Sequence, residues 1–171
     1  MLAVCGAKNS GKTTLAVNLV RRLVEAGLKV AAIKRDGHDF EPDVPGTDSF
    51  RLRQAGAAGV AVFSPRRFLV TVERPETTFA ETAAWFSWAD LIVLEGGKNS
   101  PFPKIEVVRA AISERPVATG GLVLALATDV PGDGTGPPRL ALDDVQGLME
   151  LVIDRLGLRA KTARRAQDPG A

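Results

Sequence analysis

The sequence predicts an α/β fold with a mostly parallel central sheet. Three observations support this prediction. Short apolar runs alternate with amphipathic segments, and polar residues do not interrupt these runs. A strand–helix–strand unit also begins the chain. Strands of a parallel sheet read as continuous apolar runs because helices cover both of their faces. Ligands of such sheets bind beyond the carboxyl ends of the strands, so the candidate site lies in the loops that follow the runs.

The first unit spans about 30 residues, which is the size of a βαβ motif. Residues 2–5 form a short apolar run, and residues 14–26 carry apolar side chains three or four positions apart, which predicts one helix stripe. Gly27 follows this helix where a left-handed residue is favoured, and residues 28–33 form a second apolar run. The unit therefore predicts two parallel strands of one sheet.

The rest of the chain continues the alternation of strands and helices. Thr78 with Glu81 predicts a capping box, and Asp143 or Asp144 is expected to cap the last helix. Strands are predicted at 60–63, 68–72, 91–94, 105–108 and 122–127, and helices at 48–55, 79–86 and up to residue 156. Residues 1–158 are thus predicted as one domain, followed by a basic, disordered tail at 159–171.

Composition excludes several classes of protein. The formal net charge of the 171 residues is +2, but the tail holds four basic residues and one acidic residue, so the body is close to neutral. A near-neutral body argues against nucleic-acid binding. One cysteine and one histidine argue against disulfides and against a zinc or nickel centre. No apolar run is long enough to span a membrane, and we expect a cytoplasmic protein.

The loop after the first strand carries the strongest functional motif. Residues Gly6 to Thr13 read G-A-K-N-S-G-K-T, which matches the pattern of a phosphate-binding loop at every defined position. The glycines let backbone N–H groups turn towards phosphate oxygens, and the following helix adds its positive N-terminal end. Lys12 is expected to reach the β- and γ-phosphates, and the Thr13 hydroxyl to bind Mg²⁺. The fold class is therefore predicted as the three-layer P-loop NTPase fold.

A carboxylate is expected near this loop, because P-loop sites use one to hold or orient the hydration shell of Mg²⁺. Glu95 directly follows the apolar run 91–94 and precedes two glycines, which places it at the ligand edge of the sheet. Lys12 and Glu95 are the predicted catalytic residues. Lys98 follows closely enough to contact phosphate or substrate.

The long loop after the second strand is rich in acidic residues. Asp36, Asp39, Asp43 and Asp48 follow that strand and are expected at the same edge of the sheet. One of these aspartates could complete the metal site formed by Thr13 and Glu95, and Asp48 is the predicted one. The alternative for each of these aspartates is that it is a solvated loop residue that binds no metal. His38 is expected to bond a phosphate, a carboxylate or a backbone group.

Several segments together resemble the MobB family, the molybdopterin-guanine dinucleotide biosynthesis protein B. They are the phosphate loop, the segment from Ile33 to Ser49, Gln54 to Ala57, Leu94 to Gly96, and Pro103 to Val107. The resemblance runs from about residue 2 to about residue 158. It implies a homodimeric GTP-binding protein with weak GTPase activity. Such a protein assists the guanylyltransferase MobA, which attaches GMP to molybdopterin.

The resemblance also implies roles for individual residues. The nucleotide-binding residues would be Lys8, Asn9, Ser10, Gly11, Lys12, Thr13 and Thr14. Asp39, Asp48 and Ser49 would approach the nucleotide or the pterin, with GTP and Mg²⁺ as cofactors. Two positions depart from the family: Arg35 stands where a histidine is common, and Gly97 where an aromatic residue is common.

The residues alone do not fix the base or the reaction. No N/T-K-x-D segment follows residue 127, and Asp129 is the nearest acceptor for the guanine N–H groups. Three alternatives remain. The chain could be a small-molecule kinase with Arg66 and Arg67 on a lid, or a metallochaperone-type GTPase. It could also be an interaction module whose conformation is set by bound nucleotide. No residue is a clear general base, so slow turnover is expected, below about 1 per minute.

Overall fold

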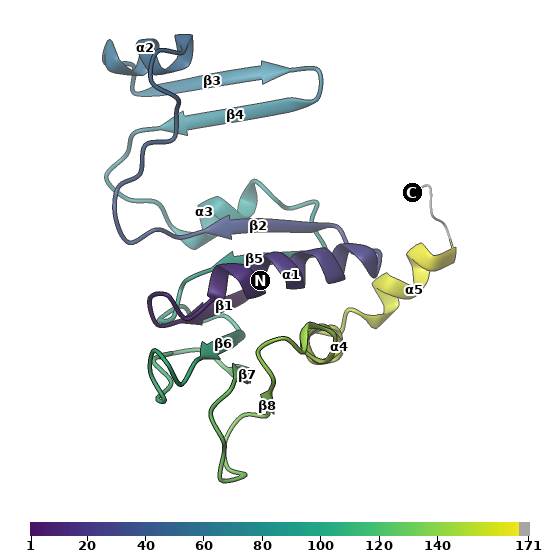
Figure 1. The fold of residues 1–171 in the computed structure, drawn as a ribbon. Coiled ribbons are helices and arrows are strands. Elements are labelled where there is room, and N and C mark those ends of the chain that lie inside the picture. The colour runs from purple at the N-terminus through teal and green to yellow at the C-terminus, as the bar shows by residue number, and fades with distance from the viewer. Residues whose placement is uncertain (168–171) are drawn as a thin grey trace. The chain divides into compact units, whose positions relative to one another are not determined.

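The computed structural model describes the backbone of residues 1–167 and the side chains of residues 1–163. The chain divides into two compact units (Figure 1). The first unit consists of Met1–Arg35 together with the chain from Trp85 onwards, and the second unit is Asp36–Ala84. Each unit has its own sheet, so the two are described separately.

The first unit is built on a six-stranded sheet in the order β2-β5-β1-β6-β7-β8, and every pair of neighbours is parallel. This arrangement confirms the predicted α/β class. The strands are β1 (Leu2–Gly6), β2 (Val30–Lys34), β5 (Leu91–Glu95), β6 (Lys104–Val108), β7 (Val123–Thr128) and β8 (Arg139–Leu140). The helices are α1 (Lys12–Glu25), α4 (Val145–Arg155) and α5 (Arg159–Gln167).

Helices α1 and α4 pack together against one face of this sheet and form its main core. Leu19 and Leu23 of α1 and Leu148 and Val152 of α4 are fully buried, as the helical spacing predicts. Each such side chain contributes about 1.5–3 kcal/mol through removal of apolar surface from water. Strand β1 lies in the middle of the sheet, and its end is therefore held firmly in place.

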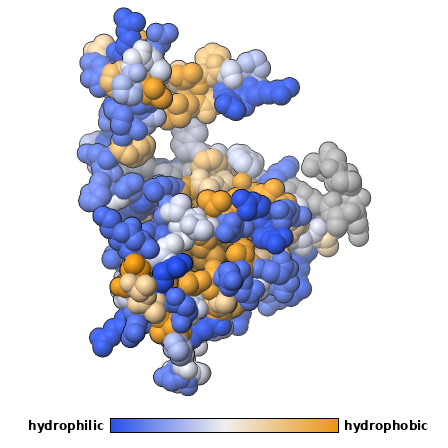
Figure 2. All heavy atoms as spheres, viewed as in Figure 1, coloured by the Kyte–Doolittle hydropathy of each residue, from blue (hydrophilic) through white to orange (hydrophobic). Residues whose placement is uncertain are grey.

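The second unit is a hairpin flanked by two short helices. Strands β3 (Gly59–Ser64) and β4 (Arg67–Val72) pair antiparallel, and helices α2 (Asp48–Gln54) and α3 (Phe79–Ala84) lie before and after them in sequence. None of residues 36–84 is buried. Figure 2 shows hydrophobic residues gathered on the hairpin, at the top of the view. An isolated two-stranded sheet is only marginally stable in water, so the unit lacks an interior of its own.

Local capping predictions are confirmed in both units. Glu81 accepts hydrogen bonds from the backbone N–H and the hydroxyl of Thr78, each at 2.8 Å, and this forms the capping box before α3. Asp144 caps α4 by accepting from the N–H of Gly147 at 2.9 Å. Side-chain acceptors are favoured at these positions because the first N–H groups of a helix have no partner within it.

Three features differ from the sequence-based expectations. The short edge strand β8 pairs with β7 and was not predicted, because two residues carry no periodic signal. Residues 36–84 form a separate unit within the single domain that was predicted. Helix α5 covers much of the predicted disordered tail, and the last part of that tail, 168–171, lies outside the described residues.

In the described part of the chain, every helix is too short or too polar to cross a lipid bilayer.

Candidate functional site

The phosphate loop begins where β1 meets its neighbour β6. Gly6 is paired in register with Val107 and has a φ of 147°. A Cβ atom at this position would lie 2.5 Å from the Val107 carbonyl oxygen, which is backbone and cannot move aside easily. Only glycine therefore fits at position 6, as the loop motif requires.

The loop between Gly6 and α1 is tightly curled. Asn9 and Gly11 adopt positive φ angles of 64° and 97°, and the N–H of Ser10 donates to the carbonyl of Ala7 at 3.3 Å. Helix α1 starts directly afterwards, with the Leu15 N–H donating to the Gly11 carbonyl at 3.0 Å. The loop therefore curls at the positive N-terminal end of α1, the arrangement that binds phosphate in P-loop proteins.

The side chains of the loop differ in burial and in their contacts. The Lys12 ammonium folds back over the loop and donates to the Ala7 carbonyl at 3.4 Å. The Ser10 hydroxyl is buried and has no hydrogen-bond partner. Four other predicted nucleotide-binding residues are exposed at the loop and the first turn of α1: Lys8, Asn9, Thr13 and Thr14. The exposed Thr13 hydroxyl fits the role of a Mg²⁺ ligand, because it is free to meet a cation in front of the helix.

Glu95 closes β5 beside the phosphate loop strand. It is paired in register with Val4 of β1 on one side and with Lys34 of β2 on the other. The Lys34 ammonium lies 3.3 Å from the Glu95 carboxylate, whose side chain is only 12% exposed. The Gly96 N–H donates to the Val4 carbonyl at 2.9 Å and extends this pairing by one bond. The carboxylate is thus held at the ligand edge of the sheet, as predicted.

Two further residues stand at the same edge on the other side of β1. Arg109 follows β6, and its Nε donates to the Ser10 carbonyl at 3.2 Å. Asp129 follows β7, is exposed, and accepts from the Ala110 N–H at 2.7 Å. Asp129 was predicted from the sequence, whereas Arg109 was not. The available signal was a basic residue directly after an apolar strand at the ligand edge.

Strand β6 also carries two buried charged residues. Lys104 is completely buried, and its ammonium donates to four carbonyl oxygens, including that of Ser100 at 2.7 Å. The other three acceptors belong to Lys98, Thr119 and Gly120. Glu106 is 1% exposed and accepts from the N–H groups of Val117 and Ala118. Together they tie the loops on either side of β6 to the sheet.

Cys5 lies next to this buried pair and is not a reactive thiol. It is paired in register with Glu106 and is only 1% exposed. Burial, together with the nearby Glu106 carboxylate, raises the pKa of the Cys5 thiol to about 12. The thiol therefore stays protonated near neutral pH and packs as a small apolar group, as expected from its place in a strand.

The remaining predicted contact residues lie elsewhere in the fold. Lys98 is exposed after β5, and its carbonyl accepts from Lys104. His38, Asp39, Asp48 and Ser49 belong to the second unit. Asp48 begins α2, and the Ser49 hydroxyl lies 3.3 Å from that of Thr47, which caps this helix. Within residues 1–167, no group of three or more His, Cys, Asp or Glu side chains is arranged to hold a metal ion.

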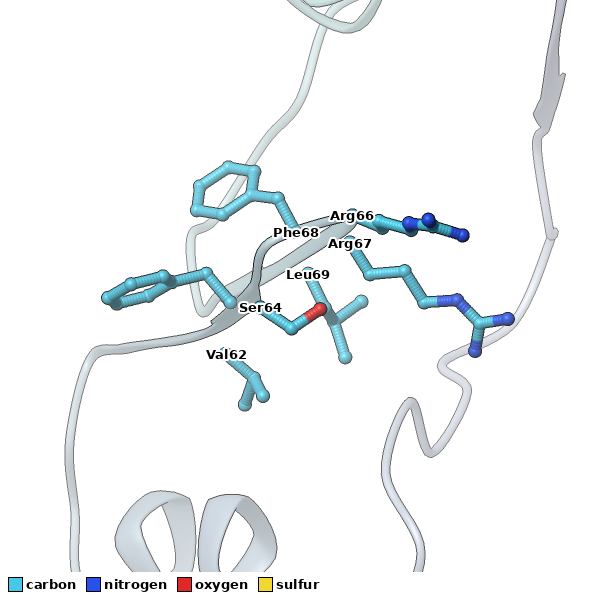
Figure 3. Close-up of a pocket in the computed structure, with 7 residues that line it drawn as sticks. Val62, Ser64, Arg66, Arg67, Phe68 and Leu69 are labelled. Atoms are coloured by element: carbon cyan, nitrogen blue, oxygen red, sulfur yellow. The ribbon is translucent and has the colours of Figure 1, made fainter.

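A hollow lies on the hairpin of the second unit. It has a volume of about 570 Å³ and is lined by Val62, Phe63, Ser64, Arg66, Arg67, Phe68 and Leu69. Figure 3 shows the guanidinium groups of Arg66 and Arg67 extending to one side and the ring of Phe68 to the other. The arginines expected on a kinase lid thus lie in an exposed hairpin turn.

A family profile matches most of the chain. Residues 1–129 match the family described as molybdopterin guanine dinucleotide synthesis protein B, MobB. This range includes the phosphate loop, Glu95, Arg109 and Asp129. The resemblance noted in the sequence is thereby confirmed.

Curated proteins of two bacteria are similar to this chain. The molybdopterin-guanine dinucleotide biosynthesis adapter protein of Escherichia coli strain K12 is 34% identical over 161 residues, which cover 90% of this chain and 91% of that protein. The protein of the same name from Haemophilus influenzae is 31% identical over 134 residues, which cover 77% and 75%. The similarity therefore extends over at least three quarters of each of these relatives.

Solved structures have the same fold. The crystal structure of Bacillus subtilis MobB superposes with a TM-score of 0.72 at 25% identity, and the match covers 90% of this chain and 95% of that one. The predicted P-loop NTPase fold is thus confirmed by the strand order of the sheet and by this likeness.

Proposed function

Because this chain belongs to the family of molybdopterin guanine dinucleotide synthesis protein B, we propose that it is an adapter in molybdopterin guanine dinucleotide biosynthesis that binds GTP with Mg²⁺. The observation that carries the nucleotide part is the curled loop at the N-terminal end of α1, which ends in Lys12 and Thr13. Such loops bind the phosphates of nucleoside triphosphates. We place the protein in the cytoplasm.

The residues of the loop have separate tasks in this proposal. Backbone N–H groups between Ala7 and Lys12 donate to phosphate oxygens, and the Lys12 ammonium moves from the Ala7 carbonyl to the β- and γ-phosphates. Thr13 and Glu95 would hold Mg²⁺. When bound, Mg²⁺ supplies neutralisation of charge on the terminal phosphates. Lys8, Asn9, Ser10 and Thr14 complete the phosphate contacts.

Asp129 is the proposed reader of guanine. It follows β7, two strands from β1 in the sheet, and its carboxylate is fixed by the Ala110 N–H. A carboxylate pairs well with two adjacent N–H donors, which guanine offers and adenine does not. Ala110 occupies one lone pair of one Asp129 oxygen, so both carboxylate oxygens can still accept from the base.

The proposed partner is a guanylyltransferase of the MobA type. The relatives in Escherichia coli and Haemophilus influenzae are named adapter proteins, and an adapter implies a second component of the same biosynthesis. Molybdopterin is a proposed ligand, and His38, Asp39, Ser49 and Lys98 are proposed contacts to nucleotide or pterin. Hydrolysis of GTP is proposed to be slow, since neither Lys12 nor Thr13 can act as a general base towards water at neutral pH.

A homodimer is proposed because the second unit buries none of its residues within one chain. Phe63 and Phe68, paired across the hairpin, are 81% and 61% exposed. Exposed aromatic residues at such density mark an interaction surface. A two-stranded sheet with open edges gains pairing partners and burial when a second copy joins it.

Calorimetric titration with Mg·GTP and Mg·ATP, side by side, tests the nucleotide part of the proposal. We expect binding of GTP at least about tenfold tighter than that of ATP, equivalent to about 1.4 kcal/mol. Equal binding, or a preference for ATP, would leave a nucleotide site but favour the kinase alternative. Binding of neither would remove the phosphate loop as a nucleotide site.

A further inference from the structure

Arg109 lies against the phosphate loop although it is far from it in sequence. Its Nε donates to the Ser10 carbonyl at 3.2 Å across a separation of 99 residues. Its Nη2 atom is 3.3 Å from the point that a Cβ of Gly11 would occupy. The guanidinium group therefore packs directly on the Ser10–Gly11 peptide.

The backbone of Arg109 is fixed independently of its side chain. The Arg109 carbonyl accepts from the N–H groups of Ile112 and Ser113, each at 2.9 Å, in the turn after β6. The next residue, Ala110, donates to Asp129. Arg109 is therefore held between the phosphate loop on one side and the end of β7 on the other.

The bond to Ser10 sets the direction of a phosphate donor. In a trans peptide the C=O of one residue and the N–H of the next point in opposite directions, and no peptide bond in the described chain is cis. The Ser10 carbonyl points at Arg109, so the Gly11 N–H points away from it. No acceptor in the described part of the protein takes this N–H. It is thus a donor that no described residue uses, on the side of the peptide opposite to Arg109.

Among the side chains that the structure describes, no carboxylate neutralises the charge of Arg109. The side chain is half-buried, and no carboxylate within residues 1–163 forms an ion pair with it. A guanidinium group carries five N–H donors, and within residues 1–163 only Nε donates a hydrogen bond. The remaining four donors and the full positive charge stay available beside the loop.

We propose that Arg109 is a further positioning residue of the nucleotide site: it turns the Gly11 N–H towards the diphosphate part of the ligand, and its positive charge lies behind that peptide. The inference rests on the proposed nucleotide binding. Loop N–H groups cradle the α- and β-phosphates, which GTP and GDP share. Loss of Arg109 therefore lowers the affinity for GTP and for GDP by a similar factor. Loss of a γ-phosphate contact would lower the affinity for GTP alone.

The test compares four proteins by calorimetry with Mg·GTP and Mg·GDP: the wild type, Arg109→Ala, Arg109→Lys and Arg115→Ala. Arg115 is the matched control, because it is an exposed arginine in the same connection, and its side chain donates no hydrogen bond. Arg109→Ala is expected to weaken both ligands by about tenfold or more, the scale of a charge-assisted hydrogen bond. Arg115→Ala is expected to stay within about twofold of the wild type.

Two readouts separate positioning from a general loss of structure. The amide resonance of Gly11 is expected to shift in ligand-free Arg109→Ala and to stay in place in Arg115→Ala. The salt dependence of GDP affinity is expected to become shallower only in Arg109→Ala, because one cation near the phosphates is lost. If Arg109→Ala does not fold, the Arg109→Lys variant tests the positioning role instead, because lysine keeps the positive charge but lacks the planar guanidinium group.

The outcomes distinguish this inference from the proposed function. A wild-type protein that binds neither nucleotide removes the proposed site itself. Tight wild-type binding with unchanged affinity in Arg109→Ala, or in Arg109→Lys where only that variant folds, overturns the role of Arg109 and leaves the site standing. Weaker binding of GTP with unchanged binding of GDP in Arg109→Ala also overturns the role of Arg109.

Discussion

The ammonium of Lys34 and the carboxylate of Glu95 lie 3.3 Å apart, at register-paired ends of two parallel strands. The two side chains differ in exposure: that of Lys34 is 60% exposed and that of Glu95 is 12% exposed. An ion pair with such an exposed partner contributes little to stability. The ion pair therefore orients the Glu95 carboxylate, and a cation at the loop can replace the Lys34 ammonium at little cost in stability.

The first prediction concerns the metal dependence of nucleotide binding. Glu95→Gln keeps the shape of the side chain but removes the charge that attracts Mg²⁺. We expect the Mg²⁺ concentration for half-maximal GTP binding to rise about tenfold, as measured by titration of Mg²⁺ at fixed GTP. Lys34→Gln is the control, because it removes the partner and keeps the carboxylate, and a change within about twofold is expected. Equal metal dependence of Glu95→Gln and wild type would exclude Glu95 from the metal site.

The second prediction concerns Lys12. Lys12→Ala is expected to abolish detectable binding of triphosphate, because the ammonium is the only side-chain charge that the loop motif requires. Its ammonium makes one long bond to a carbonyl of the loop, so the circular dichroism spectrum and melting temperature are expected to stay unchanged. Lys8→Ala, in the same loop but at an exposed position, serves for comparison. Normal affinity in folded Lys12→Ala would move the site away from the loop.

The third prediction concerns the buried ammonium of Lys104. Lys104→Met keeps most of the volume but leaves the carbonyls of Ser100 and Gly120 without their donor. Unpaired buried polar groups are unfavourable, and we expect the free energy of unfolding to fall by about 3 kcal/mol in urea titrations. Lys29→Met, at an exposed position, is expected to stay within about 0.5 kcal/mol. A loss below about 1 kcal/mol for Lys104→Met would mean that the carbonyls find other donors.

The fourth prediction concerns acid conditions and Glu81. Hydrogen bonds from the N–H and hydroxyl of Thr78, with the Arg74 guanidinium nearby, lower the pKa of Glu81 from 4.5 to about 2. A lowered folded pKa means that the charged form stabilises the fold. This stabilisation is fully present above pH about 4.5 and is lost as the pH falls towards 2.

Carboxyl carbon chemical shifts measure this directly. The Glu81 resonance is expected to titrate near pH 2, and in Thr78→Ala it should move back towards the ordinary range, because the hydroxyl donor and its capping contact are lost. Glu76, which lies nearby in sequence and outside the capping box, is an internal reference. A midpoint near 4.5 for Glu81 in the wild type would show that the capping box is not formed in solution.

The sequence predicted the phosphate loop well because its determinants are local. Gly6, the curled backbone and the first turn of α1 lie within a few residues of one another, and each follows from a known conformational preference. Glu95 was predicted because a continuous apolar run marks a central strand and its end marks the ligand edge.

Contacts between distant segments were not predicted. The bond from Arg109 to Ser10 joins residues whose proximity depends on the order β1-β6 in the sheet. The burial of Lys104 has the same origin, since a lysine at the start of a strand ordinarily reads as exposed. Its acceptors come from loops on both sides of the strand, and no pattern in the sequence links them.

The division into units was also missed for a physical reason. Val62 and Phe63 make both faces of β3 apolar, which is typical of a strand inside a sheet covered on both sides. In the structure, these side chains are 47% and 81% exposed. Helix α5 was missed because its sequence lacks an apolar stripe, although alanine, arginine and lysine all favour helix.

The absence of buried side chains between residues 36 and 84 has a consequence for the protein at low concentration. Segments without an interior open with free energies near zero, and their amide hydrogens exchange almost as fast as those of a short peptide. The strands of the larger sheet stay protected under the same conditions. In the proposed homodimer, the fraction of chains with a formed hairpin is therefore set by protein concentration through mass action, and dilution lowers it.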